Sequence, residues 1–266
     1  MSYASLYPLK RRMISTLWGL TLFLVPVLAA VEPQAGSSRG LTPLMESVRH
    51  GRLDQVKALL AAGAEVNRQD NFGMSALMWA SAIGRLEVVE VLLEAGAGIN
   101  AVNNSGFTAL IQAIDLGREE VAGLLLEKGA DPYAVESNGL SVLKHAVNKD
   151  NVAILKHLLK AGLDLNATEN RGILVQPAYR GQTEIVRLLL EAGANVDEKD
   201  PDDPYHSNAL MRASMAGNVD VVKMLLEAGA GLNVEDIDGD KAFKYAELGG
   251  NMEVVRILKQ AEAAGR

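Results

Sequence analysis

A pattern of about 33 residues recurs seven times between residue 40 and the C-terminus, and it constrains the fold more than any other feature. One apolar position marks the copies at Leu44, Leu77, Leu110, Leu143, Leu174, Leu210 and Phe243, with separations of 33, 33, 33, 31, 36 and 33 residues. A glycine next to small residues recurs in step with it, as in Ala95-Gly96-Ala97. Such a period predicts a solenoid in which each copy packs against its neighbours.

The residues inside one copy predict two helices and a turn. In the second copy, residues 73–84 form a short helical pattern, and Leu86–Glu94 carries a wide apolar stripe of helical period. Gly96 suits the left-handed backbone that ends many helices. Residues 98–106 are rich in Asn and Gly, which favours a turn. A single helix pair cannot bury its own apolar face, so each copy requires its neighbours.

Three motifs indicate the family. They are Gly40-Leu-Thr-Pro-Leu44, Gly106-Phe-Thr-Ala-Leu110, and the apolar run of residues 184–190 followed by Glu191-Ala-Gly-Ala194. With them, residues 40 to about 264 resemble the ankyrin-repeat family. The resemblance implies an all-α solenoid of about seven helix-turn-helix repeats joined by short β-hairpin turns. The repeats would start near residues 40, 73, 106, 139, 170, 206 and 239.

The chain also departs from the family pattern. The histidine that follows the anchor leucine in the family is replaced by Met45, Met78, Ile111, Lys144, Val175, Met211 and Lys244. Because that histidine ties the turn to the neighbouring hairpin in the family, looser hairpins are expected. Pro177 lies inside the first helix of the fifth copy and should kink or shorten it. A longer loop follows at residues 197–207. We interpret residues 165–208 as drift in preference to a region shaped for a partner.

The N-terminus carries a second signal. Lys10, Arg11 and Arg12 precede an uncharged apolar run over residues 13–31 that ends in small residues. This order predicts a secretory signal peptide over residues 1–30, cleaved after Ala29 or Ala30, with a flexible leader over 31–39 before a repeat domain over 40–266. The alternative is an uncleaved inner-membrane anchor, since the run is nearly long enough to span a bilayer. Cleavage is favoured because an anchor has no use for the small-residue end.

Charge and cysteine content restrict the partner and the compartment. The full chain has a net charge of −7 and no cysteine. Residues 1–30 hold three basic and no acidic residues, so cleavage would leave 23 basic and 33 acidic residues, a net charge of −10. This balance argues against nucleic acid and against an anionic membrane surface as the partner. A chain without thiols suits an oxidising compartment, so we expect a periplasmic or secreted protein, with inner-membrane anchoring as the alternative.

The sequence offers no catalytic or metal-binding pattern. The histidines His50, His145, His157 and His206 fall in different copies, whereas metal ligation needs a convergent set. Residues 236–240 lack the spacing and the terminal glutamate of a helix-loop-helix calcium site. Nucleophile elbows, phosphate loops and zinc-protease motifs are absent from the sequence. We therefore expect no enzymatic activity, no cofactor and no metal site.

The resemblance implies a protein partner bound by the hairpin tips and the concave face of the first helices. Carried over position by position, the candidate contact residues are Arg49, Phe72, Met74, Ile83, Phe107, Leu116, Leu140, Lys149, Tyr179, Arg180, Tyr205 and Met215. Aromatic, Met and Arg side chains are enriched at interfaces. The alternative is that Phe72 and Phe107 simply pack against the next hairpin. Trp79 is expected in the core.

These observations predict a monomeric interaction protein of the bacterial cell envelope, acting as a scaffold, adaptor or stabiliser. An alternative is an immunity-type inhibitor that occludes a secreted toxin or hydrolase, for which an acidic surface would suit a basic partner. An inner-membrane-anchored scaffold differs only in the fate of residues 13–30. An enzyme is the least favoured class.

Overall fold

The computed structural model describes residues 39–265, so the predicted signal peptide lies outside the described residues. Residues 39–265 belong to one compact unit that contains fourteen α-helices and one short 3-10 helix. Its β-structure is limited to isolated bridges such as Gln69 with Ser75. None of the helices in this part of the chain has both the length and the apolar character that crossing a membrane requires.

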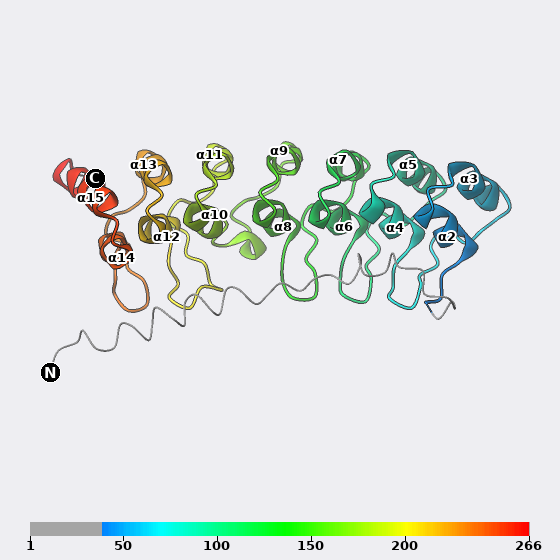
Figure 1. The fold of residues 1–266 in the computed structure, drawn as a ribbon, viewed down its shortest axis with the longest axis horizontal. Coiled ribbons are helices and arrows are strands. Elements are labelled where there is room, and N and C mark those ends of the chain that lie inside the picture. The colour runs from blue at the N-terminus through cyan, green and yellow to red at the C-terminus, as the bar shows by residue number, and fades with distance from the viewer. Residues whose placement is uncertain (1–38, 266) are drawn as a thin grey trace. The chain divides into compact units, whose positions relative to one another are not determined.

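Seven helix pairs stack side by side, with the first helices in one layer, the second helices in another, and the hairpin loops extending away from the second helices (Figure 1). The first helices are α2 (Pro43–Arg49), α4 (Ala76–Ile83), α6 (Ala109–Asp115), α8 (Val142–Asn148), α10 (Val175–Arg180), α12 (Ala209–Ala216) and α14 (Ala242–Gly249). The second helices are α3 (Leu53–Ala61), α5 (Leu86–Glu94), α7 (Glu119–Glu127), α9 (Val152–Lys160), α11 (Thr183–Glu191), α13 (Val219–Glu227) and α15 (Met252–Ala263). The predicted all-α repeat solenoid is confirmed.

The core runs along the stack between the two layers. Leu77, Leu110 and Leu143 are fully buried on successive first helices, opposite buried valines of the second helices such as Val89. Burying one such side chain contributes about 1.5–3 kcal/mol. Trp79 is also buried, at 7% exposure, as expected. Because successive first helices contact each other, each repeat is stabilised by its neighbours.

Most first helices begin with a side-chain cap. The capping residues, each accepting a bond from a backbone N–H three residues on, are Thr42, Ser75, Thr108, Ser141 and Asn208. Such a cap satisfies one of the four N–H groups that a helix start leaves without a partner. At the start of α14 the corresponding residue is Lys241, whose side chain makes no capping bond.

Replacing Lys241 with serine should therefore raise the free energy of unfolding by about 1 kcal/mol. The substitution gives up an exposed ion pair with Glu235, 3.7 Å between Nζ and Oε1, and an exposed bond of 3.0 Å from Nζ to Oδ1 of Asn233. Exposed contacts of this kind contribute little. The gain is measured as a higher midpoint in guanidinium denaturation. Lys223→Ser, at an exposed position within α13, is the matched control and should give no gain. An unchanged or lower midpoint for Lys241→Ser would contradict the capping argument.

The fifth repeat departs from the others as its sequence predicts. The helix α10 has six residues, against seven or eight in the other first helices, and it begins after the anchor Leu174 instead of before it. Pro177 occupies the first turn, where its missing N–H removes no internal helix bond. The 3-10 helix η3 (Thr168–Asn170) precedes it. The predicted shortening of this helix is confirmed.

Candidate functional site

In four of the repeats, a side-chain hydrogen bond or ion pair links the hairpin to the first helix that follows it. In each case an acidic residue in the hairpin bonds the residue that lies nine positions later, two after the anchor. The four pairs are Asp70–Trp79, Glu136–His145, Asp203–Arg212 and Asp236–Tyr245. Each hairpin therefore has a fixed position relative to its helix.

The same acidic residues also organise the turn backbone. The Oδ1 atom of Asp70 accepts bonds from the backbone N–H groups of Phe72 and Met74, both at 2.9 Å. Asp236 does the same for two N–H groups of the seventh hairpin. These bonds fix the conformation of the turns in a chain that lacks the histidine with which the family ties the turn to the neighbouring hairpin. The sequence signal was present as an acidic residue nine positions before a Trp, His, Arg or Tyr, but only the structure shows that the two meet.

In three of the four pairs the helix partner, Trp79, His145 or Arg212, also contacts the end of the preceding first helix. The guanidinium of Arg49 lies 5.4 Å from the ring centroid of Trp79, and that of Arg212 lies 5.9 Å from the ring of Tyr179. Polar and aromatic contacts therefore link neighbouring repeats along this surface. We call it the first-helix face, defined by the C-terminal ends of the first helices and the hairpins beside them.

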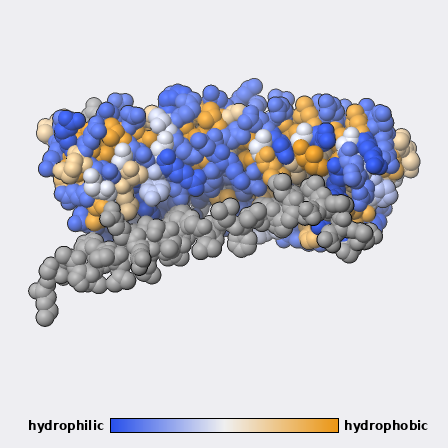
Figure 2. Space-filling view, viewed as in Figure 1, coloured by the Kyte–Doolittle hydropathy of each residue, from blue (hydrophilic) through white to orange (hydrophobic). Residues whose placement is uncertain are grey.

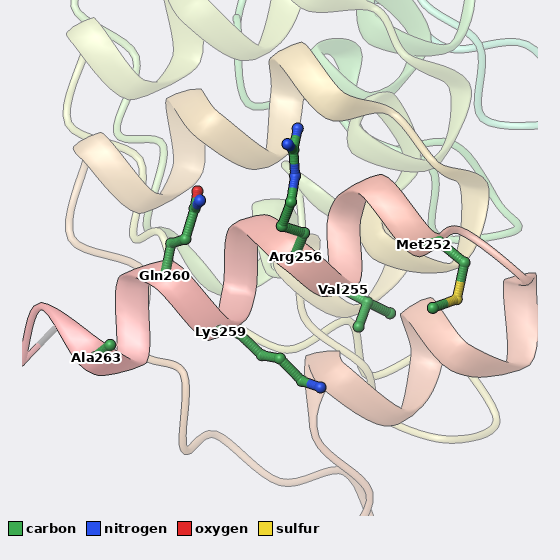
Figure 3. A pocket seen from close by; sticks show the side chains of 6 residues that line it. All are labelled: Met252, Val255, Arg256, Lys259, Gln260 and Ala263. Carbon is green, nitrogen blue, oxygen red and sulfur yellow. The ribbon is translucent and has the colours of Figure 1, made fainter.

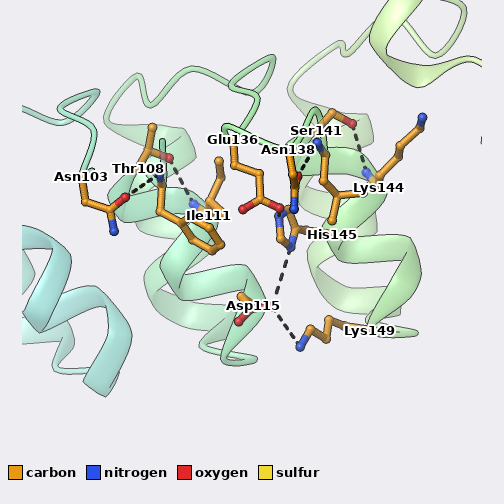
Figure 4. Close-up of polar contacts among 12 residues, drawn as sticks. Asn103, Thr108, Ile111, Asp115, Glu136, Asn138, Ser141, Lys144, His145 and Lys149 are labelled. Atoms are coloured by element: carbon orange, nitrogen blue, oxygen red, sulfur yellow. Dashed lines mark hydrogen bonds and ion pairs between the residues drawn. The ribbon is translucent and has the colours of Figure 1, made fainter. Parts of the chain in front are cut away.

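A polar cluster on this face surrounds Asp115 (Figure 4). Its Oδ1 atom lies 2.9 Å from Nζ of Lys149 and 3.7 Å from Nδ1 of His145. The other imidazole nitrogen of His145 lies 3.1 Å from Glu136, so the buried ring bridges two carboxylates. The interaction with His145, supported by Lys149, holds the pKa of Asp115 below its usual value, although burial acts in the opposite direction.

Asp115→Asn should make the free energy of unfolding depend less on pH in the acidic range. A carboxylate whose pKa is lowered by folding stabilises the folded state above its unfolded value, and the contribution is lost as the pH falls through the folded value. At pH 7 the variant should lose about 1 kcal/mol, and this difference should shrink below about pH 4. Urea denaturation across pH 3–7 measures it, with the exposed Asp54→Asn as control. A difference that grows on acidification would contradict the assignment.

The predicted contact residues lie at different depths on the first-helix face. Phe72 and Tyr179 are exposed at 56% and 45%, and Lys149 and Arg180 are exposed as well. The half-buried members are Arg49, Ile83, Phe107, Leu116, Leu140, Tyr205 and Met215. Met74 is 4% exposed, and its sulfur lies 3.3 Å from Nδ2 of Asn103, so its side chain has little surface to offer. Whether the set contacts a partner stays a prediction.

Phe107 both packs against a neighbouring repeat and remains partly exposed. Its ring lies 5.8 Å from the imidazole of His145, nearly edge to face, so it packs against the next repeat while part of it remains accessible. The alternative interpretation of Phe107 as a packing residue therefore has a structural basis.

Two further features of residues 39–265 bear on chemistry. A pocket on the outer side of the last helix is lined by Met252, Val255, Arg256, Lys259, Gln260 and Ala263 (Figure 3). All of these residues come from α15, and they form an apolar strip with cationic edges. Within the described part of the chain, His, Asp and Glu side chains do not gather in groups of three or more that could hold a metal ion.

Comparisons with known proteins agree with this architecture. The sequence matches the family described as ankyrin repeats (3 copies) at residues 44–136, 131–200 and 174–264. The crystal structure of the human ASB11 ankyrin repeat domain is similar with a TM-score of 0.69 and 27% identity, over 82% of this chain and 98% of that one. The ankyrin repeat domain of Bcl-3, a member of the IkappaB protein family, is similar with a TM-score of 0.74 and 28% identity, over 83% and 99%.

None of the curated proteins matches the sequence. The family match nevertheless extends over nearly all of residues 44–264, the same segment in which the structure shows stacked helix pairs. This chain belongs to the ankyrin-repeat family.

Proposed function

We propose that this protein is a non-enzymatic interaction module that acts in the bacterial cell envelope as a scaffold, adaptor or stabiliser. Ankyrin repeats are general protein–protein interaction modules, and the similar solved structures are domains of that kind. The proposed binding surface is the first-helix face with its hairpin tips.

The observation that carries this proposal is the exposure of large apolar side chains on the hairpins. Phe72, Val102, Val135 and Ile237 are all exposed there, in four different hairpins. Exposed apolar patches on a folded protein mark contact sites, and a partner that spans several repeats would contact these four side chains together. Figure 2 shows apolar side chains interspersed with hydrophilic ones on the side drawn, a mixture that suits reversible binding.

The envelope location rests on the N-terminal sequence. The basic start, apolar middle and small-residue end of residues 1–30 support export with cleavage after Ala29 or Ala30. N-terminal sequencing of the protein from producing cells tests this directly. A chain that starts at Ala30 or Val31 supports export and cleavage, whereas an intact N-terminus in the membrane fraction would favour the anchored scaffold.

Binding is tested by capture from an envelope extract with the full chain as bait. We compare the parent with a variant that carries Phe72→Ala, Phe107→Ala and Tyr179→Ala. The matched control carries three exposed substitutions on second helices, Lys57→Ala, Glu90→Ala and Lys223→Ala. We expect one dominant protein to be held by the parent and the control and lost from the variant. Equal capture by all three would contradict binding through the first-helix face.

A second candidate is an immunity-type inhibitor, which the acidic hairpins of the last two repeats favour. Residues 195–207 and 233–241 together hold nine acidic residues and two lysines. An inhibitor of this type would abolish the activity of a basic toxin or hydrolase at one-to-one stoichiometry, whereas an adaptor would leave its partner active. An activity assay on the captured protein separates the two.

A further inference from the structure

The last three repeats carry large apolar side chains at one position of the first-helix face. These are Tyr179, Met215 and Leu248, five residues after each anchor, and we call them the apolar row. The equivalent residues of the first four repeats are Arg49, Ala82, Asp115 and Asn148. Tyr179 and Leu248 are exposed at 45% and 42%, and Met215 between them is half-buried. The row is therefore specific to repeats five to seven.

Contacts beneath the apolar row link the neighbouring helix ends that carry its members. The guanidinium of Arg212 lies against the ring of Tyr179, and its Nη1 atom lies 4.0 Å from the sulfur of Met215. Nδ2 of Asn251 donates to the carbonyl oxygen of Met215 at 2.9 Å. At Gly249 the helices α12 and α14 are so close that an added Cβ would lie 2.3 Å from that same oxygen. Successive members of the row are thus held at adjacent helix ends.

Carboxylates lie in the hairpins that precede the helices α12 and α14. The hairpins of repeats six and seven are acidic, whereas residues 98–108 of the third hairpin hold no charged residue. Within residues 39–265, the carboxylates of Asp238 and Asp240 form no ion pair. Asp240 precedes α14 by two residues and Leu248 is its seventh residue, so the helical part of the path between them rises roughly 9 Å. One bound segment can therefore contact both.

We propose that the apolar row and these carboxylates bind a basic amphipathic segment of a partner protein. The inference rests on the proposed function and deepens it. Apolar side chains of the segment would pack on Tyr179, Met215 and Leu248, and its Lys or Arg side chains would face Asp238 and Asp240. A second copy of this chain fits poorly, because a symmetric contact would place acidic hairpins against each other.

Peptide binding to the purified full chain tests the proposal. The probes are a labelled amphipathic peptide of Leu and Lys, the same peptide with Glu in place of Lys, and one with Ser in place of Leu. Fluorescence anisotropy at low and high salt gives each Kd. We expect the Leu and Lys peptide to bind at least about tenfold more tightly than either control, with an affinity that falls as salt rises. Equal binding of the Leu and Glu peptide would overturn the proposal.

Variants of the protein localise the binding. The triple variant Tyr179→Ser, Met215→Ser and Leu248→Ser should lose at least about tenfold in affinity, and Asp238→Asn with Asp240→Asn should lose affinity and most of its salt dependence. Ala58→Ser, at an exposed position of the second helix α3 and so outside the first-helix face, is the control and should bind as the parent does. Circular dichroism verifies that each variant is folded.

The outcomes separate this inference from the proposed function. Unchanged peptide binding by the triple variant, or equal loss in Ala58→Ser, would overturn the inference. In that case, capture of a partner that is lost from a variant carrying only Phe72→Ala and Phe107→Ala would leave the proposed function standing. Loss of both capture and peptide binding would contradict the two together.

Discussion

Replacing Arg212 with methionine should lower the free energy of unfolding by about 3–5 kcal/mol. The Asp203 carboxylate that this guanidinium bonds is almost fully buried, and the Arg212 side chain is only 10% exposed. Methionine keeps much of the volume but leaves Asp203 as a buried charge without its cation. Because Arg212 also lies against Tyr179, the loss should affect the contact between repeats five and six as well. Chemical denaturation monitored by circular dichroism measures the change.

Two controls test whether the loss of stability comes from the burial of the ion pair between Arg212 and Asp203. Arg187→Met breaks exposed contacts to Glu184 and Glu191 and should cost less than about 1 kcal/mol. Adding Asp203→Asn to Arg212→Met removes the buried charge and should recover part of the loss. A cost for Arg212→Met no larger than that for Arg187→Met would show that the buried pair does not hold the hairpin.

Gly249→Ala should destabilise the C-terminal repeats by about 1–3 kcal/mol or more. The new Cβ would lie 2.3 Å from the carbonyl oxygen of Met215, which is a backbone atom and cannot turn aside. To make room, α14 must move away from α12, and that movement weakens the bond from Asn251 to the same oxygen. Because repeats contact only their neighbours, amide hydrogen exchange should rise mainly in α14 and α15.

Gly98→Ala is the matched control for Gly249. Neither glycine has a positive φ, and a Cβ at Gly98 would meet other atoms only at 3.5 Å or more, an ordinary contact. We expect this substitution to change stability by less than about 0.5 kcal/mol. Equal stability of Gly249→Ala and the parent would mean that α12 and α14 are less closely packed than described.

The sequence predicts the repeats well because period and helix signals are local. The anchor leucines, the turn glycines and Pro177 each act within one or two turns of the chain, so their consequences can be derived without coordinates. The side-chain bonds between hairpins and first helices could not be predicted from the sequence, because the bonded residue types change from Asp70 with Trp79 to Asp203 with Arg212. What the pairs share is that the two side chains lie close together in the fold, and no single sequence motif describes that.

The candidate site shows a similar limit. Phe72 and Met74 are two residues apart in one turn, yet one is exposed and the other buried, because Asp70 binds the backbone of both and fixes which side chain points inward. The position of a residue in the family pattern therefore predicts which surface of the solenoid it belongs to, but not how far its side chain is buried. The apolar row emerges only when residues 33 or 36 positions apart are seen on adjacent helix ends.

Site-specific photo-crosslinking in producing cells tests the central claim, that the first-helix face binds a partner protein. A photoreactive amino acid is placed at Met215 on that face, and in a second strain at Ala58, exposed on the second helix α3. The account predicts a crosslink to one protein from position 215 and none from position 58. Crosslinks from position 58 alone, or from neither position, would contradict it.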